Sequence, residues 1–191
     1  MSEARRGTEV EVRAITTGDV DAVRRFFARV PEGDRTFFRE DVLEPGVVER
    51  WVADPGQHRL IAIVDGEVAG HAAIIPGVAW SGHVGELRLV IDPEYRRRGL
   101  GRLLAQRAVV ESIELGMTKL IVEVVAEQQA TVAMFSALGF EAEGLLKDHV
   151  RSRDGEVHDL LVLAHFVEAL SATMATTGID ELVLGESADG G

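Results

Sequence analysis

The sequence contains no cysteine, and this absence removes several kinds of chemistry. Without thiols, the chain can have no disulfide framework, no thiolate metal site and no cysteine nucleophile. None of its six histidines stands in an HxH or HExxH spacing. Each histidine is therefore better explained as a strand-surface or core residue than as a metal ligand, and we expect no metal site.

Long apolar runs are also missing. No run approaches the roughly 18 residues that a membrane-spanning helix needs. The N-terminal segment MSEARRGTEVEV lacks the apolar stretch of a signal peptide. We therefore expect a cytoplasmic protein with no membrane partner.

Basic residues are scarce relative to acidic ones. The chain has 20 lysines and arginines against 32 acidic residues, a formal net charge of −12, which argues against nucleic acid as a partner. The local exception is a cluster of arginines: Arg96, Arg97, Arg98 and Arg102. This contrast favours a specific anion pocket, while the acidic remainder would tolerate a cationic amine substrate.

The size and composition fit one ordinary domain. A chain of 191 residues, 46% of them hydrophobic, can bury a substantial core and is not compositionally disordered. We expect a single folded domain over residues 1–165. Residues 166–191 should form a helical extension that ends in a flexible acidic tail. Either a monomer or a homodimer fits these features.

The rest of the chain is organised around residues 85–116, GELRLVIDPEYRRRGLGRLLAQRAVVESIELG. The pattern predicts a strand over residues 86–91. This strand ends at Pro93, which has no amide donor and disfavours helical angles in the residue before it. Apolar residues then recur at helical spacing from Leu100 onward, and Gly116 suits the position just past a helix end.

A strand, a glycine-bearing turn and a helix start together predict an anion site. The first turn of a helix has unpaired backbone N–H groups and partial positive charge. Gly99 and Gly101 allow a ligand to approach the backbone closely, and the arginines supply charged forks that match phosphate groups. This turn should bind a pyrophosphate. The alternative is a solvated basic turn that only caps a helix.

The spacing distinguishes this turn from other phosphate loops. It lacks the GKS or GKT ending of a Walker loop and the three glycines of a dinucleotide fingerprint. Arg96-x-x-Gly99-x-Gly101 instead resembles the Q/R-x-x-G-x-G/A signature of the GNAT superfamily of N-acetyltransferases. In that family, this turn holds the pyrophosphate of acetyl-coenzyme A.

The order of the expected elements supports the resemblance. The patterns predict strands over residues 10–15, 58–64, 67–75, 86–91, 120–125, 141–150 and 158–165, and helices over 20–29, 45–53, 99–115 and 130–138. Asp65-Gly66 between alternating apolar runs is a hairpin signal, and the apolar run at 120–125 is typical of a strand buried on both faces. The order matches the GNAT layout over roughly residues 9–165.

The resemblance implies an α/β (α+β) fold. Its mixed central sheet of about seven strands has flanking helices and splays between the central strands, here after Val125. The pantetheine arm of acetyl-coenzyme A would bind the backbone of Leu89, Val90 and Ile91, with the Leu89 N–H polarising the thioester carbonyl. The remaining coenzyme contacts would come from the turn: Arg96, Arg97, Arg98, Gly99, Leu100, Gly101 and Arg102.

Transfer to an amine needs a base, because an ammonium ion has no lone pair. Glu86 lies ten residues before Arg96, and this position resembles that of the catalytic glutamate in bacterial protein-lysine acetyltransferases of the superfamily. The alternative is a structural ion pair of Glu86 with Arg88 or Arg13. Glu127, just past the next strand, is the second candidate base.

The expected helix at 130–138 departs from the family pattern N-x-x-A-x-x-x-Y-x-x-x-G-F. The corresponding residues are Gln128, Thr131, Phe135, Gly139 and Phe140. The family tyrosine often protonates the departing thiolate, and Phe135 cannot. We expect Phe135 to pack against the pantetheine arm or the core, and Gln128 to take over the asparagine's contact with the coenzyme.

The resemblance therefore predicts an enzyme that moves an acetyl group from acetyl-coenzyme A to a primary amine by direct attack in a ternary complex. The segment FFARVPEGDRTFFRED loosely resembles the catalytic domain of protein-lysine acetyltransferases. A protein lysine is therefore one possible acceptor, and polyamines, amino acids and aminoglycosides are others. The missing tyrosine leaves a second hypothesis, a non-catalytic acyl-coenzyme A sensor.

Overall fold

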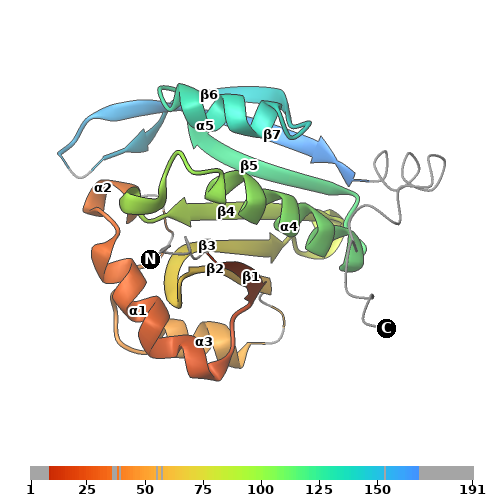
Figure 1. Cartoon of the computed structure of the whole chain (residues 1–191). Coiled ribbons are helices and arrows are strands. Elements are labelled where there is room, and N and C mark those ends of the chain that lie inside the picture. Colours follow the sequence, from red (N-terminus) through yellow and green to blue (C-terminus); the bar gives the residue numbers. More distant parts are fainter. Residues whose placement is uncertain are drawn as a thin grey trace, which may run out of the picture.

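The computed structural model describes residues 9–35, 38, 40–54, 56, 58–152 and 154–167. A seven-stranded sheet has the order β1-β2-β3-β4-β5-β7-β6 (Figure 1). Its strands are β1 (Val10–Ala14), β2 (His58–Val64), β3 (Glu67–Pro76), β4 (Val84–Ile91), β5 (Lys119–Val125), β6 (Glu141–Arg151) and β7 (Val157–Phe166). Its helices are α1 (Val20–Arg29), α2 (Glu32–Arg35), α3 (Val47–Ala53), α4 (Leu100–Glu114) and α5 (Gln129–Ser136).

The sheet is mixed, as the sequence predicts. β4 and β5 are parallel, whereas the other neighbouring strands are antiparallel. The hairpin between β2 and β3 turns at Asp65 and Gly66, whose φ angles are 49° and 86°. Two successive left-handed residues form the turn that Asp-Gly favours, and this explains how a short sequence signal fixes the register between β2 and β3.

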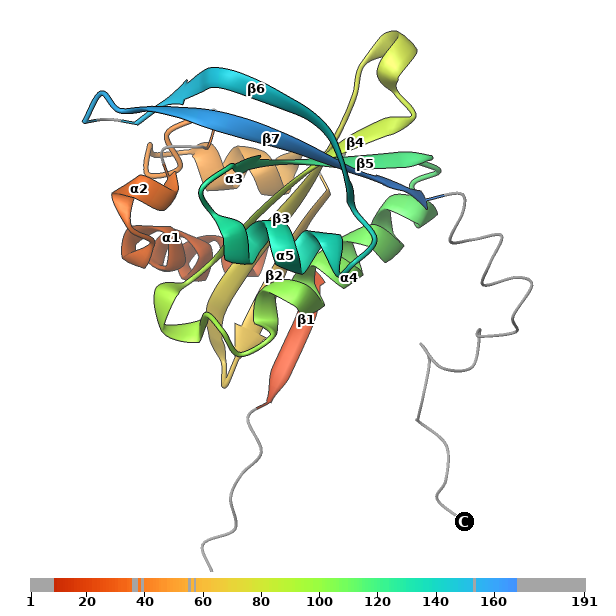
Figure 2. The same ribbon diagram turned by 90° about the horizontal axis from the view of Figure 1, so that it is seen from above.

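Helices cover both faces of the sheet. α1 and α3 lie against one face and α4 and α5 against the other (Figures 1 and 2). On the first face, Phe26, Phe27 and Trp51 pack over Ile61 and Val90. The core on the second face is formed by Leu104 and other apolar residues of α4, by Phe135 and Phe140, and by alternate residues of the strands, among them Leu60, Ala72, Leu87, Leu120 and Leu163.

Three details differ from the sequence prediction. β5 is not buried on both faces: Glu123 is exposed and Ile121 half-buried, because α1 and α3 lie over the strands on the other side of β4. Residues 32–35, where the sequence predicts no helix, form the single turn α2. Phe166 ends β7, although it was predicted to begin a helix; the rest of that predicted extension lies outside the described residues.

The connection between β3 and β4 projects from the body of the molecule (Figure 2). It carries Val78 and Trp80, whose exposed fractions are 82% and 93%. The turn is tight, because a Cβ atom at Gly77 would come within 2.3 Å of the Ser81 carbonyl oxygen. Only glycine fits there, so the backbone itself holds the two apolar side chains outward.

No helix in the described part of the chain is long and apolar enough to cross a membrane.

Candidate functional site

The sheet opens between its two parallel strands. The β4–β5 ladder pairs Val84 with Lys119 and ends where Glu86 pairs with Ile121. Both strands continue beyond this point, β4 to Ile91 and β5 to Val125, and β5 diverges from β4 (Figure 1). The splay expected between the central strands is therefore present, but it begins after Ile121 and not after Val125.

The direction of the β4 backbone groups follows from the register with β3. The Asp92 N–H donates to the Ala69 oxygen at 2.9 Å, and the Gly77 N–H donates to the Val84 oxygen at 2.8 Å. In an antiparallel ladder the bonded positions alternate, so even-numbered residues of β4 exchange hydrogen bonds with β3. The amides of Leu89 and Ile91 therefore point toward β5, beyond the last β4–β5 pair.

The turn after β4 has the geometry of a helix start with an open N-terminus. Asp92 is buried, and its side chain accepts a hydrogen bond from the Glu94 N–H at 3.1 Å. Gly99 is the N-cap residue of α4 and has a φ of 83°. A Cβ atom at Gly99 would meet nothing within 4 Å. The glycine is thus required by its left-handed backbone, and the space beside it is open.

The arginines of this turn are not equivalent. The Arg96 Nε donates to the Ile91 oxygen at 3.0 Å, and its Nη2 donates to Asp34 Oδ2 at 2.6 Å. Arg96 therefore joins the end of β4 to α2 and has a structural task. The Arg98 guanidinium lies 5.6 Å from the centre of the Tyr95 ring, and Arg97 has a left-handed φ of 60°.

Gly101 occupies a different environment from Gly99. Its Cβ position faces Met134 of α5 at 3.4 Å and Ile91 at 3.5 Å. It therefore lies between β4 and α5, the two elements that border the splay. A charged side chain at this position would enter apolar packing, so Gly101 is a poorer probe of the turn than Gly99.

Glu86 forms the ion pair that the sequence leaves open as its alternative role. The Arg88 Nε donates to Glu86 Oε1 at 2.7 Å, and Nη2 donates to Oε2 at 3.2 Å. Each side chain is 17% exposed, so solvent reaches both. Alternation along β4 directs them to the α1 and α3 face, next to the point where the ladder with β5 ends.

The remaining predicted site residues lie around α5. Glu127 is 63% exposed, with Oε1 at 3.8 Å from His158 Nδ1, and Gln128 is the exposed N-cap residue of α5. Phe135 is 2% exposed and packs edge-on against Phe140, with ring centres 5.1 Å apart. Core packing is therefore the role observed for Phe135.

The sequence reasoning missed a charged cluster beside Glu86 and Arg88. The Arg59 guanidinium lies 3.8 Å from the centre of the Trp51 ring and 3.8 Å from Glu40 Oε1. The Trp51 Nε1 donates to the same carboxylate at 2.7 Å. Burial lowers the pKa of Arg59 to about 10, and the positive charge of Arg88 also lowers it. Arg59 and Arg88 lie in one row of the sheet, because both pair with Ala73.

His71 lies beneath this cluster. Its ring stacks on Trp51 with centres 5.4 Å apart and is fully buried, and neither ring nitrogen has a hydrogen-bond partner in the described part of the structure. Burial, followed by the charge of Arg59, lowers the pKa of His71 well below its ordinary value. The neutral imidazole of His71, which belongs to β3, therefore packs against the face of the Trp51 ring that is turned toward the sheet.

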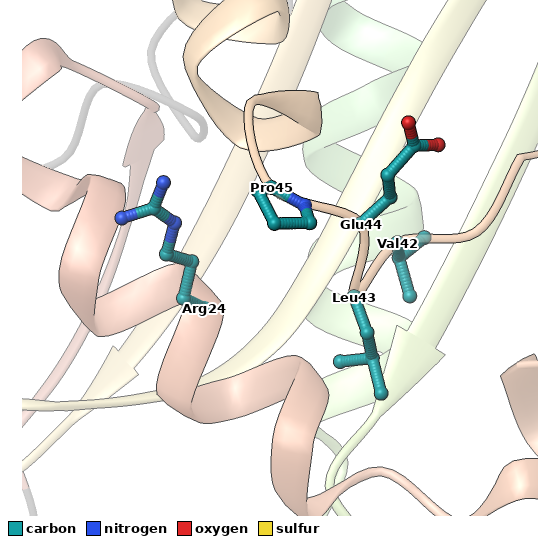
Figure 3. A pocket seen from close by; sticks show the side chains of 5 residues that line it. All are labelled: Arg24, Val42, Leu43, Glu44 and Pro45. Atoms are coloured by element: carbon teal, nitrogen blue, oxygen red, sulfur yellow. The ribbon is translucent and has the colours of Figure 1, made fainter.

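Two surface hollows lie away from the splay. One of about 370 Å³ lies between α1 and the segment before α3, lined by Arg24, Val42, Leu43, Glu44 and Pro45 (Figure 3). It contains no residue of β4 or of the α4 turn, so the site rests on backbone geometry and not on this hollow. Among the described residues, no group of three or more His, Asp or Glu side chains is arranged to hold a metal ion.

Comparisons with known proteins agree with this geometry. A model of the acetyltransferase (GNAT) family matches residues 21–140. The chain is 26% identical over 160 residues to the L-amino acid N-acetyltransferase AaaT of Escherichia coli, covering 82% of this chain and 98% of that protein. It is 32% identical over 76 residues to the ribosomal protein bS18-alanine N-acetyltransferase of the same organism, covering 40% of this chain and 51% of that protein.

Solved structures show the same fold. A ribosomal-protein-alanine N-acetyltransferase from Brucella melitensis has a TM-score of 0.71, with 25% identity over 82% of this chain and 99% of that chain. The Salmonella typhimurium protein yncA, solved with its cofactor acetyl-CoA, has a TM-score of 0.69 and 17% identity over 83% of this chain and 94% of that one.

Proposed function

We propose how this chain works from the premise that it belongs to the acetyltransferase (GNAT) family and is an acetyl-CoA-dependent N-acetyltransferase. The proposed reaction moves the acetyl group to a primary amine by direct attack in a ternary complex. The observation that carries this proposal is the position of the Leu89 and Ile91 amides. They face the splay directly beside the glycine turn that begins α4.

The coenzyme would be held at two places. The turn from Arg97 to Gly101 presents the open N-terminus of α4 and formal positive charge to the pyrophosphate. The pantetheine arm would then take the strand position that β5 vacates after Ile121, using backbone groups of Leu89, Val90 and Ile91. Arg102, in the first turn of α4, and Gln128, at the N-cap of α5, would make further contacts, whereas Arg96 would act by shaping the turn.

The acetyl group would lie near the end of the β4–β5 ladder. There the Leu89 N–H would polarise the thioester carbonyl as negative charge develops on its oxygen. Glu86 would remove one proton from the acceptor ammonium. The neutral nitrogen then attacks the carbonyl carbon, the C–S bond breaks, and a second amine proton leaves with the thiolate. Glu127 is the alternative base.

The acceptor is proposed to be an α-amino group. The two relatives compared above are named for transfer to L-amino acids and to the alanine of a ribosomal protein. This supports an α-amine over a lysine side chain, although the chain spans only about half of the second relative. A cytoplasmic location and a monomeric or homodimeric state stay predictions.

Amide hydrogen exchange tests the coenzyme site. Adding acetyl-CoA should slow exchange at Leu89 and Ile91, because their amides would gain an acceptor. Arg88 and Val90 on the same strand are the matched control, since their amides already bond to β3 and should change little. Equal effects on all four residues, or none on any, would refute the proposed path of the pantetheine arm.

A further inference from the structure

The Glu86–Arg88 pair presents opposite charges side by side on one strand face. A carboxylate and a guanidinium are joined there at 2.7 and 3.2 Å, and both side chains remain 17% exposed. Glu86 is in the last β4–β5 pair and Arg88 lies two residues beyond it, both on the α1 and α3 face of the sheet. An acceptor that reaches the acetyl group at this point would meet both charges.

A second guanidinium lies in the same row of the sheet. Arg59 on β2 and Arg88 on β4 are both paired with Ala73 of β3, which lies between them. Alanine is too short to separate the two long side chains. Glu40 lies 3.8 Å from the Arg59 guanidinium and 4.0 Å from that of Arg50, and the charge of Asp54 also acts on Arg59. With Glu86 and Arg88, the cluster therefore holds three cations and three anions. Such a balanced cluster suits a ligand that itself has both charges and no net charge.

We propose that the acceptor is a free α-amino acid, whose carboxylate binds Arg88 while its ammonium group binds Glu86. The inference rests on the proposed function, which places the acceptor amine at Glu86. Guanidinium groups bind carboxylates in a forked, two-bond geometry. The ammonium and carboxylate of an α-amino acid are separated by one carbon, and this matches charges that lie on a single strand two residues apart.

The ion pair then has a part in the reaction. In the resting protein, Arg88 occupies both oxygens of Glu86. The incoming carboxylate would take over the Arg88 hydrogen bonds, and Glu86 would become available to the ammonium proton. An acceptor without a carboxylate would leave the resting pair intact. The Glu86–Arg88 pair would thus select amino acids over amines that have no neighbouring negative charge. The positive charge of Arg59 would add to the attraction for the substrate carboxylate.

Amino acids and their amides test the inference, because an amide keeps the α-amine and loses the carboxylate charge. Thiol release from acetyl-CoA is measured with L-alanine, L-methionine and L-phenylalanine and with the amide of each. For the best pair, kcat/KM should be about 10- to 100-fold higher for the acid, the range for a hydrogen-bonded charge. Equal rates for acid and amide would overturn the proposal.

Variants locate the effect at Arg88. Arg88→Gln should raise KM for the acid about 10- to 100-fold and leave KM for the amide nearly unchanged, and Arg88→Lys should partly restore the acid. Arg24→Gln, which removes an exposed ion pair on α1, is the matched control and should change neither substrate. A loss that is equal for acid and amide would show a structural role for Arg88 and refute the inference.

A binding measurement separates failure of the inference from failure of the proposed function. Calorimetry in the presence of coenzyme A should detect binding of the amino acids, and the Kd of each amide should be about 10-fold higher than that of its acid. If no amine is acetylated, the proposed function fails, and the calorimetric comparison still decides the inference. If lysine-bearing peptides with blocked N-termini are the best acceptors, the α-amino acid assignment is wrong while N-acetyl transfer stands.

Discussion

At the scale of single residues, the role of Glu86 as general base can be separated from its role as the ion-pair partner of Arg88. If it is the base, Glu86→Gln should lower kcat about 10²- to 10⁴-fold and leave acetyl-CoA affinity little changed, because the coenzyme is expected to bind strand backbone. Raising the pH should partly restore the variant, since more of the amine is then already deprotonated. Steady-state kinetics from pH 7 to 10, with calorimetry for the coenzyme, measure these effects.

Glu143→Gln is the control for this experiment. Both oxygens of Glu143 accept from Lys119 Nζ at 2.7 Å, so the variant also removes a strand-to-strand ion pair but lies on β6. It should retain wild-type kcat. A stable, fully active Glu86→Gln enzyme across the pH range would mean that Glu86 is only the partner of Arg88, and Glu127 would be the next residue to test.

Asp19 shows how one carboxylate links folding to pH. Its carboxylate oxygens accept hydrogen bonds from Arg13 Nη1 and Nη2 at 2.7 and 2.8 Å and from the backbone N–H and hydroxyl of Thr16. The hydrogen bonds from Arg13 are the largest cause that lowers the pKa of Asp19. Since the folded pKa lies below the unfolded value near 3.9, the unfolded chain takes up the proton first. The stabilisation is therefore complete above about pH 4 and is lost as the pH falls through the lowered pKa.

Asp19→Asn should consequently cost about 1.5–3 kcal/mol at pH 7, the range for hydrogen bonds to a charged group. The difference in free energy of unfolding between Asp19→Asn and the wild type should shrink as the pH falls from 4 toward 2. Urea unfolding at several pH values measures both effects. A difference that stays constant over this range would contradict a role for the Asp19 charge.

At the scale of elements, the turn between β4 and α4 depends on backbone conformation. Gly99→Ala should cost about 1–2 kcal/mol, because its φ of 83° is left-handed, and it should weaken acetyl-CoA binding by distorting the helix N-terminus. Gly116 is the matched control: it follows the other end of α4, has a φ of 71°, and its Cβ position is also open.

Gly116→Ala should therefore lose a similar amount of stability and keep its coenzyme affinity. Chemical denaturation and calorimetry with acetyl-CoA give the two quantities for each variant. If both variants bind acetyl-CoA like the wild type, the turn at Gly99 does not hold the coenzyme.

The elements were predictable because their signals are local. The Asp65-Gly66 hairpin and the β4–turn–α4 unit each depend on neighbouring residues, and the structure confirms both. The start of the splay was not predictable, because it depends on where a ladder between distant strands ends. The same limit applies to the site: Glu40, Trp51 and Arg59 come from three segments with no shared period, so only the fold reveals that they meet.

At the scale of the whole molecule, the short β4–β5 ladder divides the sheet into two parts. β1 to β4 form one continuous antiparallel part, and β5, β7 and β6 form the other. A ligand that binds along β4 would complete the hydrogen bonding between these parts. Ligand binding to the folded state alone stabilises it by about 2.7 kcal/mol at a concentration of 100 Kd, and here that gain would act across the shortest ladder of the sheet.

The two tryptophans give this molecule a pair of built-in optical probes. Trp80 is 93% exposed at the tip of the β3–β4 connection, whereas Trp51 is 2% exposed and lies against Arg59. The emission of Trp80 should be red-shifted and quenched by acrylamide, and that of Trp51 blue-shifted and shielded. In a Trp80→Phe protein, the remaining fluorescence would therefore report on the arginine row as acceptors bind, with no added label.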